Sequence, residues 1–546
     1  MNYRTALLKY FRQRDRAWIL SLFMAVCIVY LPFLGNPFFF DDLPFFSGDV
    51  TEGYAHSQFH FDPRWLPYAS LSWTYAIFSD VNTYFFHLGN LLLHAGNVIL
   101  LFYLLRQLVG AAIAEDEKSP AIIWGAWFGA LVFAFHPVAV YAAGYIVQRT
   151  ILMATLFVLV MQLAYVKGLL TGQRRWLILA VIAYFLAAFS KEHSVMVPAV
   201  LAALTILLRD KNKLDRRSLA LCWGAFIVIA VLLILSAKGV IGTVYEPTAT
   251  TQFEQQGVIA STAKLHLLSI FTQAGLFFKY LILWIVPNPA WMSIDMREPF
   301  IASLGAWQGW AGMLGFIAYG IFSVRLLLYP RWTGLIGLAL LYPWLLFMVE
   351  FSSIRMQEIF VLYRSYLWMP GLMLFFPWLL SRFPGRGTWL ALGCLVLLLL
   401  PLSWNRLWVF ADNYRMWNDA AKLLPSEQAV GADRIFFNRG HAATVRGKWQ
   451  EAMADYERVV ARNPEIAVVH HDLGVTYFNT KRYQDAIVQF DLTISLDPEY
   501  AKAYFDKGMA LKYLHQDDLA MQQMKKSCEL KYAMACVIVK LQLPKK

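Results

Sequence analysis

Two stretches decide the fold of the C-terminal part of the chain, residues 440–464 (GHAATVRGKWQEAMADYERVVARNP) and residues 474–498 (GVTYFNTKRYQDAIVQFDLTISLDP). They match at an offset of 34 residues, and a weaker third copy begins at Gly508. The positions that share the period are Gly440, Gly474 and Gly508, then Ala452, Ala486 and Ala520, then Tyr456, Phe490 and Met524, with Trp449 and Tyr483, and Pro464 and Pro498.

A 34-residue period with small residues at two helix contacts and a closing proline is typical of the tetratricopeptide repeat. Small residues let paired helices approach, and proline ends the second helix. The third copy has Asp517 and Tyr532 in place of the aromatic residue and the proline, as expected of a terminal cap. We therefore predict a soluble α-solenoid of three repeats over 433–546, joined through a connecting helix and linker at 405–432, that binds peptide or protein.

The remainder, residues 1–404, is dominated by apolar runs. The whole chain of 546 residues is 59% apolar and only 15% charged, whereas soluble domains carry about 25% charged residues. Runs of about twenty apolar residues predict transmembrane helices. The sequence therefore predicts an all-α protein whose first domain is polytopic, with eleven spans at about 17–35, 83–108, 121–142, 146–166, 176–190, 193–208, 218–237, 306–326, 333–350, 365–381 and 388–404.

The stretch 265–286 is also apolar and decides the topology. Positive residues favour the cytoplasmic side, which accounts for the net charge of +12 without a nucleic-acid partner. If 265–286 spans fully, the arginine pairs Arg325/Arg331 and Arg382/Arg386 fall outside and the repeats become cytoplasmic. If it re-enters or lies in the interface, every basic loop faces the cytoplasm. We expect the second arrangement, with eleven spans and the repeats outside.

The five cysteines form no disulfide scaffold. Cys27, Cys222 and Cys394 lie in apolar runs. Cys528 and Cys536 would be about 12 Å apart on one continuous helix, beyond the reach of a disulfide. A bridge between them requires a turn and an oxidising compartment.

Under this topology the unusual polar residues gather on the outer face. Ionisable residues near membrane depth are costly and usually functional. A carboxylate there can act as general base on a hydroxyl, and nearby cations can hold a phosphate leaving group. This combination suggests group transfer from a polyprenyl-phosphate donor. The candidate residues are Asp41, Asp42, His136, Arg149, Lys191, Glu192, His193, Asp295, Glu358, Arg364 and Tyr366.

The order of several motifs resembles a known family. They are FDD at 40–42, HLGNLLLHAGNVILLFYLLRQL at 87–108, AFHPVAVYAAGYIVQRTILMATLF at 134–157, SKEHSVMVPA at 190–199, VPNPAWMSID at 286–295, YRSYLWMP at 363–370 and WNRLWVFADNYRMWNDAAKLLP at 404–425. Together with the repeats, this order is similar to that of the transmembrane-and-tetratricopeptide O-glycosyltransferases of the GT-C superfamily, and it looks more like their bacterial branch.

The resemblance implies an inverting glycosyltransferase in a bacterial inner membrane, with its site on the periplasmic face. It implies a catalytic acid in the pair Asp41 and Asp42, of which we favour Asp41 as the base. Arg149, Lys191 and Arg364 match basic positions that would hold the donor phosphate. The donor would be a polyprenyl-phosphate sugar and the acceptor a Ser or Thr of an exported protein such as pilin, and no metal is expected. The supporting residues would be His136, Glu192, His193, Asp295, Glu358 and Tyr366.

Two alternatives stay open. An enzyme of the same fold could act on a glycan or a lipid, although a peptide-binding array has no obvious use there. A non-catalytic scaffold could use the repeats to recruit an assembly, although eleven spans and an outer polar cluster exceed what an anchor needs.

Overall fold

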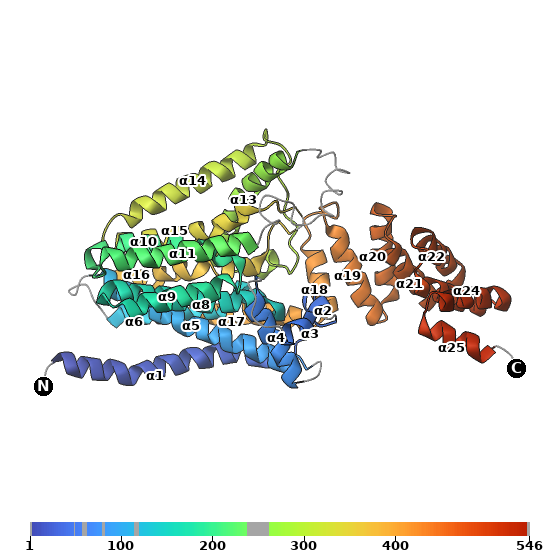
Figure 1. Cartoon of the computed structure of the whole chain (residues 1–546), viewed down its shortest axis with the longest axis horizontal. Helices are drawn as coiled ribbons and strands as arrows, with labels where there is room; N and C mark the ends of the chain where they lie inside the picture. The colour runs from blue at the N-terminus through green and yellow to red at the C-terminus, as the bar shows by residue number, and fades with distance from the viewer. Residues whose placement is uncertain are drawn as a thin grey trace. The chain divides into compact units, whose positions relative to one another are not determined.

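The computed structural model describes residues 3–47, 50–56, 63–78, 82–113, 120–236, 261–356 and 358–542. All its regular elements are helices, and one isolated antiparallel bridge joins Met296 and Phe360. The predicted all-α class is confirmed. The chain divides into two compact units, Met1–Asp412 and Asn413–Lys546 (Figure 1). The boundary lies beyond residue 404 because the last helix of the first unit continues to Phe410.

The first unit is a bundle of long apolar helices. Eight of its described helical segments are long and apolar enough to cross a membrane, or nine if the bent pair α6 and α7 counts as one. Fewer pass than the eleven spans expected, because α9 has 15 residues, α10 has 11 and α16 has eight. The α-helices of this unit are α1 (Tyr3–Tyr30), α2 (Asp42–Ser47), α3 (Val50–His56), α4 (Trp65–Phe78), α5 (Tyr84–Ala112), α6 (Pro120–Phe135), α7 (Pro137–Ala143), α8 (Arg149–Thr171), α9 (Arg174–Ala188), α10 (Val197–Leu207), α11 (Arg216–Ser236), α13 (Thr262–Ile285), α14 (Trp307–Leu327), α15 (Arg331–Phe347), α16 (Phe375–Arg382) and α17 (Arg386–Phe410).

Short 3-10 turns join these helices. They are η1 (Leu31–Phe33), η3 (Ile146–Gln148), η4 (Glu192–Met196), η5 (Arg209–Lys211), η6 (Pro289–Trp291), η7 (Met348–Ser352), η8 (Leu362–Tyr366) and η9 (Met369–Leu374). Three of them, η3, η4 and η8, carry polar residues that meet at one end of the bundle, as described below.

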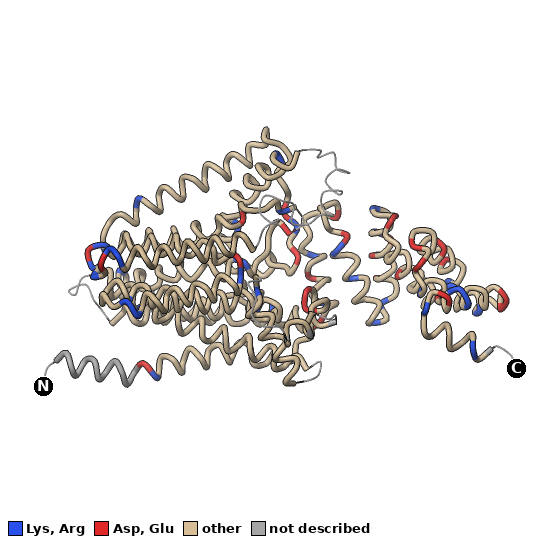
Figure 2. Tube along the Cα trace, viewed as in Figure 1, with Lys and Arg blue, Asp and Glu red and all other residues tan. Residues whose placement is uncertain are grey.

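The other end of the bundle is basic, and we call it the basic end. There the α10–α11 connection contacts three other helix ends. The Lys213 N–H donates to Leu169 O at 2.8 Å, Arg209 Nη2 to Leu328 O at 3.3 Å, and Lys211 Nζ to Ala111 O at 2.5 Å. Figure 2 shows lysines and arginines concentrated in these connections.

Helix α13 covers the stretch whose topology the sequence left in question. It is continuous over 24 residues, and α14 runs beside it in the same direction, since Gly309 lies against Phe271 and Gly312 against Gly275. The connection between them passes back along α13, where the Ile301 N–H donates to Thr272 Oγ1 at 2.9 Å. Two consecutive helices that run parallel both start at the same end of the bundle, so the chain returns along α13 before α14 begins.

The second unit consists of helix pairs at the predicted period. Its helices are α18 (Asn413–Lys422), α19 (Ala432–Val445), α20 (Trp449–Arg462), α21 (Ala467–Asn479), α22 (Tyr483–Leu496), α23 (Ala501–Tyr513), α24 (Asp517–Glu529) and α25 (Ala533–Gln542). The turn within each pair places Gly447, Lys481 and His515 at φ of 68°, 63° and 59°, again 34 residues apart. The glycines pack as expected, since Gly440 lies against Tyr456 and Gly474 against Phe490. The predicted tetratricopeptide repeats are confirmed.

The last turn of this unit joins two cysteines. Helix α24 ends at Glu529, Lys531 has φ 67°, and α25 begins at Ala533. This reversal brings the Cα atoms of Cys528 and Cys536 to 4.6 Å and allows a disulfide between them. The turn that the spacing required is therefore present.

The disulfide gives a test of the compartment of the second unit. We expect two of the five cysteines to resist alkylation by a maleimide polymer in denatured, unreduced protein taken directly from cells, because disulfides persist only in oxidising compartments. Gel mobility measures the number of polymers added. The Cys528→Ser variant should gain one reactive thiol, from Cys536. Equal reaction of all five cysteines in the unreduced wild-type chain would contradict an oxidising location.

Candidate functional site

A cavity of about 500 Å³ opens at the end of the bundle opposite the basic end. It is built where α2, α4, η3, η4 and η8 meet, so its walls come from segments far apart in sequence. The lining residues are Asp41, Pro44, Phe45, Val50, Arg64, Tyr68, Val147, Gln148, Thr150, Lys191, Glu192, His193, Arg355, Glu358, Tyr363 and Arg364. Six of the predicted site residues are among them.

The acid pair forms one wall, and its two members differ in environment. Asp41 is exposed and lines the cavity, and its N–H donates to the Tyr145 hydroxyl at 2.9 Å. Asp42 is fully buried and accepts hydrogen bonds from the N–H of Val147 at 2.8 Å and of Phe39 at 3.3 Å. Burial raises the pKa of the Asp42 carboxyl well above its usual range, and these hydrogen bonds oppose the shift. Asp42 therefore fixes the loop, while Asp41 faces the cavity.

Backbone strain accompanies this wall. Phe40, immediately before Asp41, has φ 52°, and Arg64 in the facing segment has φ 68°. Residues other than glycine rarely adopt a positive φ, and those that do cluster at functional sites. Arg64 is held by a two-pronged ion pair with Glu192, with Nε–Oε2 at 3.0 Å and Nη2–Oε1 at 2.5 Å. The pair joins the start of α4 to η4.

Lys191 also lines the cavity. Its side chain is buried, and its ammonium lies 5.6 Å from the centre of the Tyr363 ring. Burial and the nearby cations Arg64 and Arg364 lower the pKa of Lys191 to about 7, although Glu192 opposes the shift. Among the described residues no acceptor forms a hydrogen bond or ion pair with this ammonium. Lys191 is thus a cation directed at the cavity and poised to gain or lose its proton near neutral pH.

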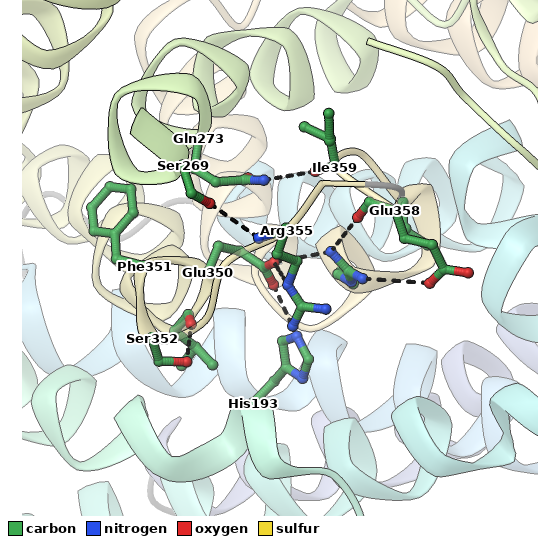
Figure 3. Close-up of polar contacts among 12 residues, drawn as sticks. His193, Ser269, Gln273, Glu350, Phe351, Ser352, Arg355, Glu358 and Ile359 are labelled. Carbon is green, nitrogen blue, oxygen red and sulfur yellow. Dashed lines mark hydrogen bonds and ion pairs between the residues drawn. The ribbon is translucent and has the colours of Figure 1, made fainter. Parts of the chain in front are cut away.

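Glu350 contacts three basic side chains that line the cavity. It is completely buried, and it contacts His193 Nε2 at 2.9 Å, Arg364 Nη1 at 3.0 Å and Arg355 Nε at 3.2 Å (Figure 3). These three partners all line the cavity. One carboxylate therefore holds three basic side chains at the cavity wall, and each comes from a different segment.

Helix α13 fixes the loop that carries Arg355 and Glu358. The Arg355 N–H donates to Ser269 Oγ at 3.1 Å, and Gln273 Nε2 donates to Ile359 O at 2.8 Å (Figure 3). Tyr280 then bonds both the N–H and the carbonyl of Val361, each at 2.9 Å. The loop is therefore attached to α13 along its length, which positions η8 and Arg364.

Five predicted residues, among them Asp42, lie outside the cavity lining. The guanidinium of Arg149 is occupied by Asn90 Oδ1 at 2.9 Å and Phe86 O at 2.9 Å, so it is not available to hold a donor phosphate in this arrangement. His136 caps α7 and stacks on Trp284 at 4.2 Å. Asp295 pairs with Arg297 at 2.6 Å, and Tyr366 bonds His94 at 2.6 Å. These side chains and Asp42 form contacts between segments of the first unit and do not line the cavity that contains Asp41.

Three residues that the sequence did not single out belong to the site: Arg64, Arg355 and Glu350. Glu350 closes an apolar stretch, and an acid in such a stretch is itself a signal of function. Arg64 and Arg355 stand in polar connections, where nothing local separates them from ordinary loop charges. Only the folded chain brings them to the cavity.

The cavity can hold an anion next to a carboxylate. Lys191, Arg355 and Arg364 supply charge-assisted donors suited to phosphate oxygens, and Asp41 adds an exposed carboxylate to the same lining. Within the described part of the chain, no three His, Cys, Asp or Glu side chains cluster closely enough to suggest a metal site.

No protein-family model matches the chain, and no curated protein matches it. Solved structures do resemble it. A tetratricopeptide domain of OM64 from Arabidopsis is 21% identical, with TM-score 0.20, covering 20% of this chain and 92% of the other. MamA from Desulfovibrio magneticus is 19% identical, with TM-score 0.20, covering 30% and 84%. YrrB, described as a TPR protein with an unusual peptide-binding site, is 16% identical, with TM-score 0.22, covering 31% and 81%.

The two aspartates should respond differently to the same substitution. Asp42→Asn removes one of two acceptors for buried N–H groups and should lower the free energy of unfolding by about 1–3 kcal/mol. Asp41→Asn, at an exposed carboxylate, should lower it less. Thermal unfolding of the detergent-solubilised chain measures both. Equal stability of the wild type and Asp42→Asn would contradict the anchoring role.

The ammonium of Lys191 should make anion binding depend on pH. With its pKa at about 7, Lys191 is protonated below that value and neutral above it, so the affinity for sulfate should fall as pH rises through 7. Sulfate keeps its charge over this range, and calorimetry measures its binding. Lys191→Arg keeps the charge and should remove most of the dependence. An unchanged pH profile in this variant would assign the dependence to another group.

Proposed function

We propose that the chain is an integral-membrane O-glycosyltransferase of the GT-C type, which transfers a sugar from a polyprenyl-phosphate donor to Ser or Thr of an exported protein. The observation that carries the proposal is a cavity at one end of an apolar bundle whose lining combines Asp41 with Lys191, Arg355 and Arg364. A lipid-linked donor reaches such a cavity laterally from the bilayer, and its phosphate meets cations there.

The proposed reaction is a displacement at the anomeric carbon. The Asp41 carboxylate takes the proton of the acceptor hydroxyl, whose oxygen forms the new bond to that carbon. The bond between the anomeric carbon and the phosphate oxygen breaks, and the electron pair leaves with the lipid phosphate. Lys191, Arg355 and Arg364 stabilise the charge that develops on this leaving group. Attack from the side opposite the phosphate inverts the configuration.

The arrangement of the first unit supports eleven crossings. The parallel course of α13 and α14 fits a re-entrant 262–306, and α9, α10 and the η9–α16 segment then each complete a crossing. The basic end faces the cytoplasm under the positive-inside rule, and the cavity end faces the periplasm. Helix α17 ends at the cavity side, where the Phe410 and Phe39 rings lie 4.9 Å apart, so the chain continues into the second unit from that side.

The second unit would then present the acceptor. Tetratricopeptide arrays expose surfaces that bind other proteins, and the Cys528–Cys536 disulfide suits a periplasmic location. An exported protein such as pilin is the proposed acceptor. A bacterial inner-membrane enzyme with both the cavity and the repeats on one side could act on such a protein during or after export.

The reaction is tested by mass spectrometry of exported proteins from cells that carry the wild-type chain, no chain, or the Asp41→Asn variant. We expect a hexose- or pentose-sized mass on Ser- or Thr-containing peptides that vanishes without the chain. In Asp41→Asn it should fall by about 10²–10⁴-fold, the usual contribution of a general base. Asp210→Asn, at an exposed aspartate of the basic end, is the charge-matched control and should retain full activity.

Each other outcome excludes a part of the proposal. No change in any exported protein, with the chain expressed, would shift the acceptor to a glycan or lipid, and lipid-linked sugars would be analysed next. Full glycosylation in Asp41→Asn would exclude the proposed base. If neither proteins, glycans nor lipids depend on the chain, the scaffold alternative stands.

A further inference from the structure

A second cavity, apolar except at one end, lies toward the basic end and away from the proposed active site. It is a groove of about 470 Å³ formed by α5, α8 and α9. Its polar part contains Arg106, Gln107 and Lys167, flanked by Tyr103 and Trp176. The rest of the groove is apolar, with Leu100, Val160, Leu163 and Leu179 among the side chains. Cations at one end and an apolar floor match a molecule with an anionic head and a hydrocarbon tail.

We infer that this groove binds an anionic phospholipid, with the headgroup phosphate at Lys167 and Arg106 and an acyl chain along α8. The inference goes beyond glycosyl transfer and requires only that the first unit is embedded in a bilayer. Val160 and Lys167 are two helical turns apart, about 10 Å along the axis. This distance separates the charged end of the groove from its apolar floor.

Lys167 is held in a manner suited to a phosphate. Its ammonium lies 3.8 Å from the centre of the Trp176 ring, and within the described ranges it has no carboxylate at ion-pair distance. Arg106 is paired with Asp15 at 2.6 Å, and both side chains stay partly exposed, at 27% and 30%. The ring of Trp176 restricts the ammonium without neutralising it, so an added phosphate meets a full positive charge.

The surroundings favour a bilayer lipid over a soluble phosphate. Leu179 in the groove is 38% exposed, and Ile178 and Ile182 on the same helix are 61% and 51% exposed. Tryptophan and tyrosine, present here as Trp176 and Tyr103, are enriched where membranes meet water. Basic pockets between transmembrane helices on the cytoplasmic side bind anionic lipid headgroups.

The experiment uses the full chain in phosphatidylcholine vesicles that contain a photoactivatable phosphatidylglycerol. Cross-linked peptides are mapped by mass spectrometry. We expect cross-links within 100–107 and 160–167, reduced about fivefold in Lys167→Gln, as one cation near an anionic lipid contributes about that factor. Lys213→Gln is the matched control, because Lys213 is an exposed lysine of the same end and outside the groove. It should leave cross-linking unchanged.

A second variant separates the groove from its charge. Leu179→Trp fills the groove while both cations remain, and it should also reduce cross-linking, which covers the case that Lys167→Gln folds poorly. Equal cross-linking in wild type and both groove variants would overturn the inference. So would equal labelling of these peptides by a photoactivatable phosphatidylcholine, or displacement of the label by glycerol 3-phosphate, which would make the ligand a soluble phosphate. The readout is independent of transfer activity, so its failure leaves the proposed function untouched.

Discussion

The cavity depends on one buried charge, the carboxylate of Glu350. A fully buried carboxylate is costly unless it is paired and hydrogen-bonded. Here it contacts His193 from η4, Arg355 from the loop that follows η7, and Arg364 from η8. The same contacts that neutralise Glu350 bring basic side chains from three segments to one wall. A change at this acid would remove one polar partner from all three side chains at once.

Helix α13 gives this arrangement its rigidity. A loop that lies among apolar helices must find partners for its backbone groups, and the loop that carries Arg355 finds them on Ser269, Gln273 and Tyr280. These three contacts depend on α13 alone and not on the path of the chain after it. The return along 286–306 also brings Met292 O to Arg406 Nη1 at 2.8 Å, and so links the connection between α13 and α14 to the end of α17.

The sequence predicted the repeats well, and six of its candidate residues line the cavity. A period of 34 residues is a local regularity, so Gly474 and Phe490 could be matched from spacing alone. Asp41, Lys191 and Arg364 were also found, because a charge flanked by apolar spans is conspicuous. Arg149 is equally conspicuous, yet Asn90 and Phe86 on another helix occupy its guanidinium, and nothing near Arg149 in sequence announces those partners. Arg64 was missed for the converse reason, since its role comes from Glu192, 128 residues away.

The different environments of the Asp41 and Asp42 side chains follow from the turn at Phe40, whose φ is positive. With Phe40 in the left-handed region, the chain turns so that Asp41 lines the cavity and the next residue, Asp42, is buried. The buried acid meets the N–H groups of Val147 and Phe39 and serves the backbone. The backbone of Asp41 is fixed because its N–H donates to the Tyr145 hydroxyl. Its side chain lines the cavity. Asp41 is therefore accessible from the cavity, while the hydrogen bonds of Asp42 fix the backbone beside it.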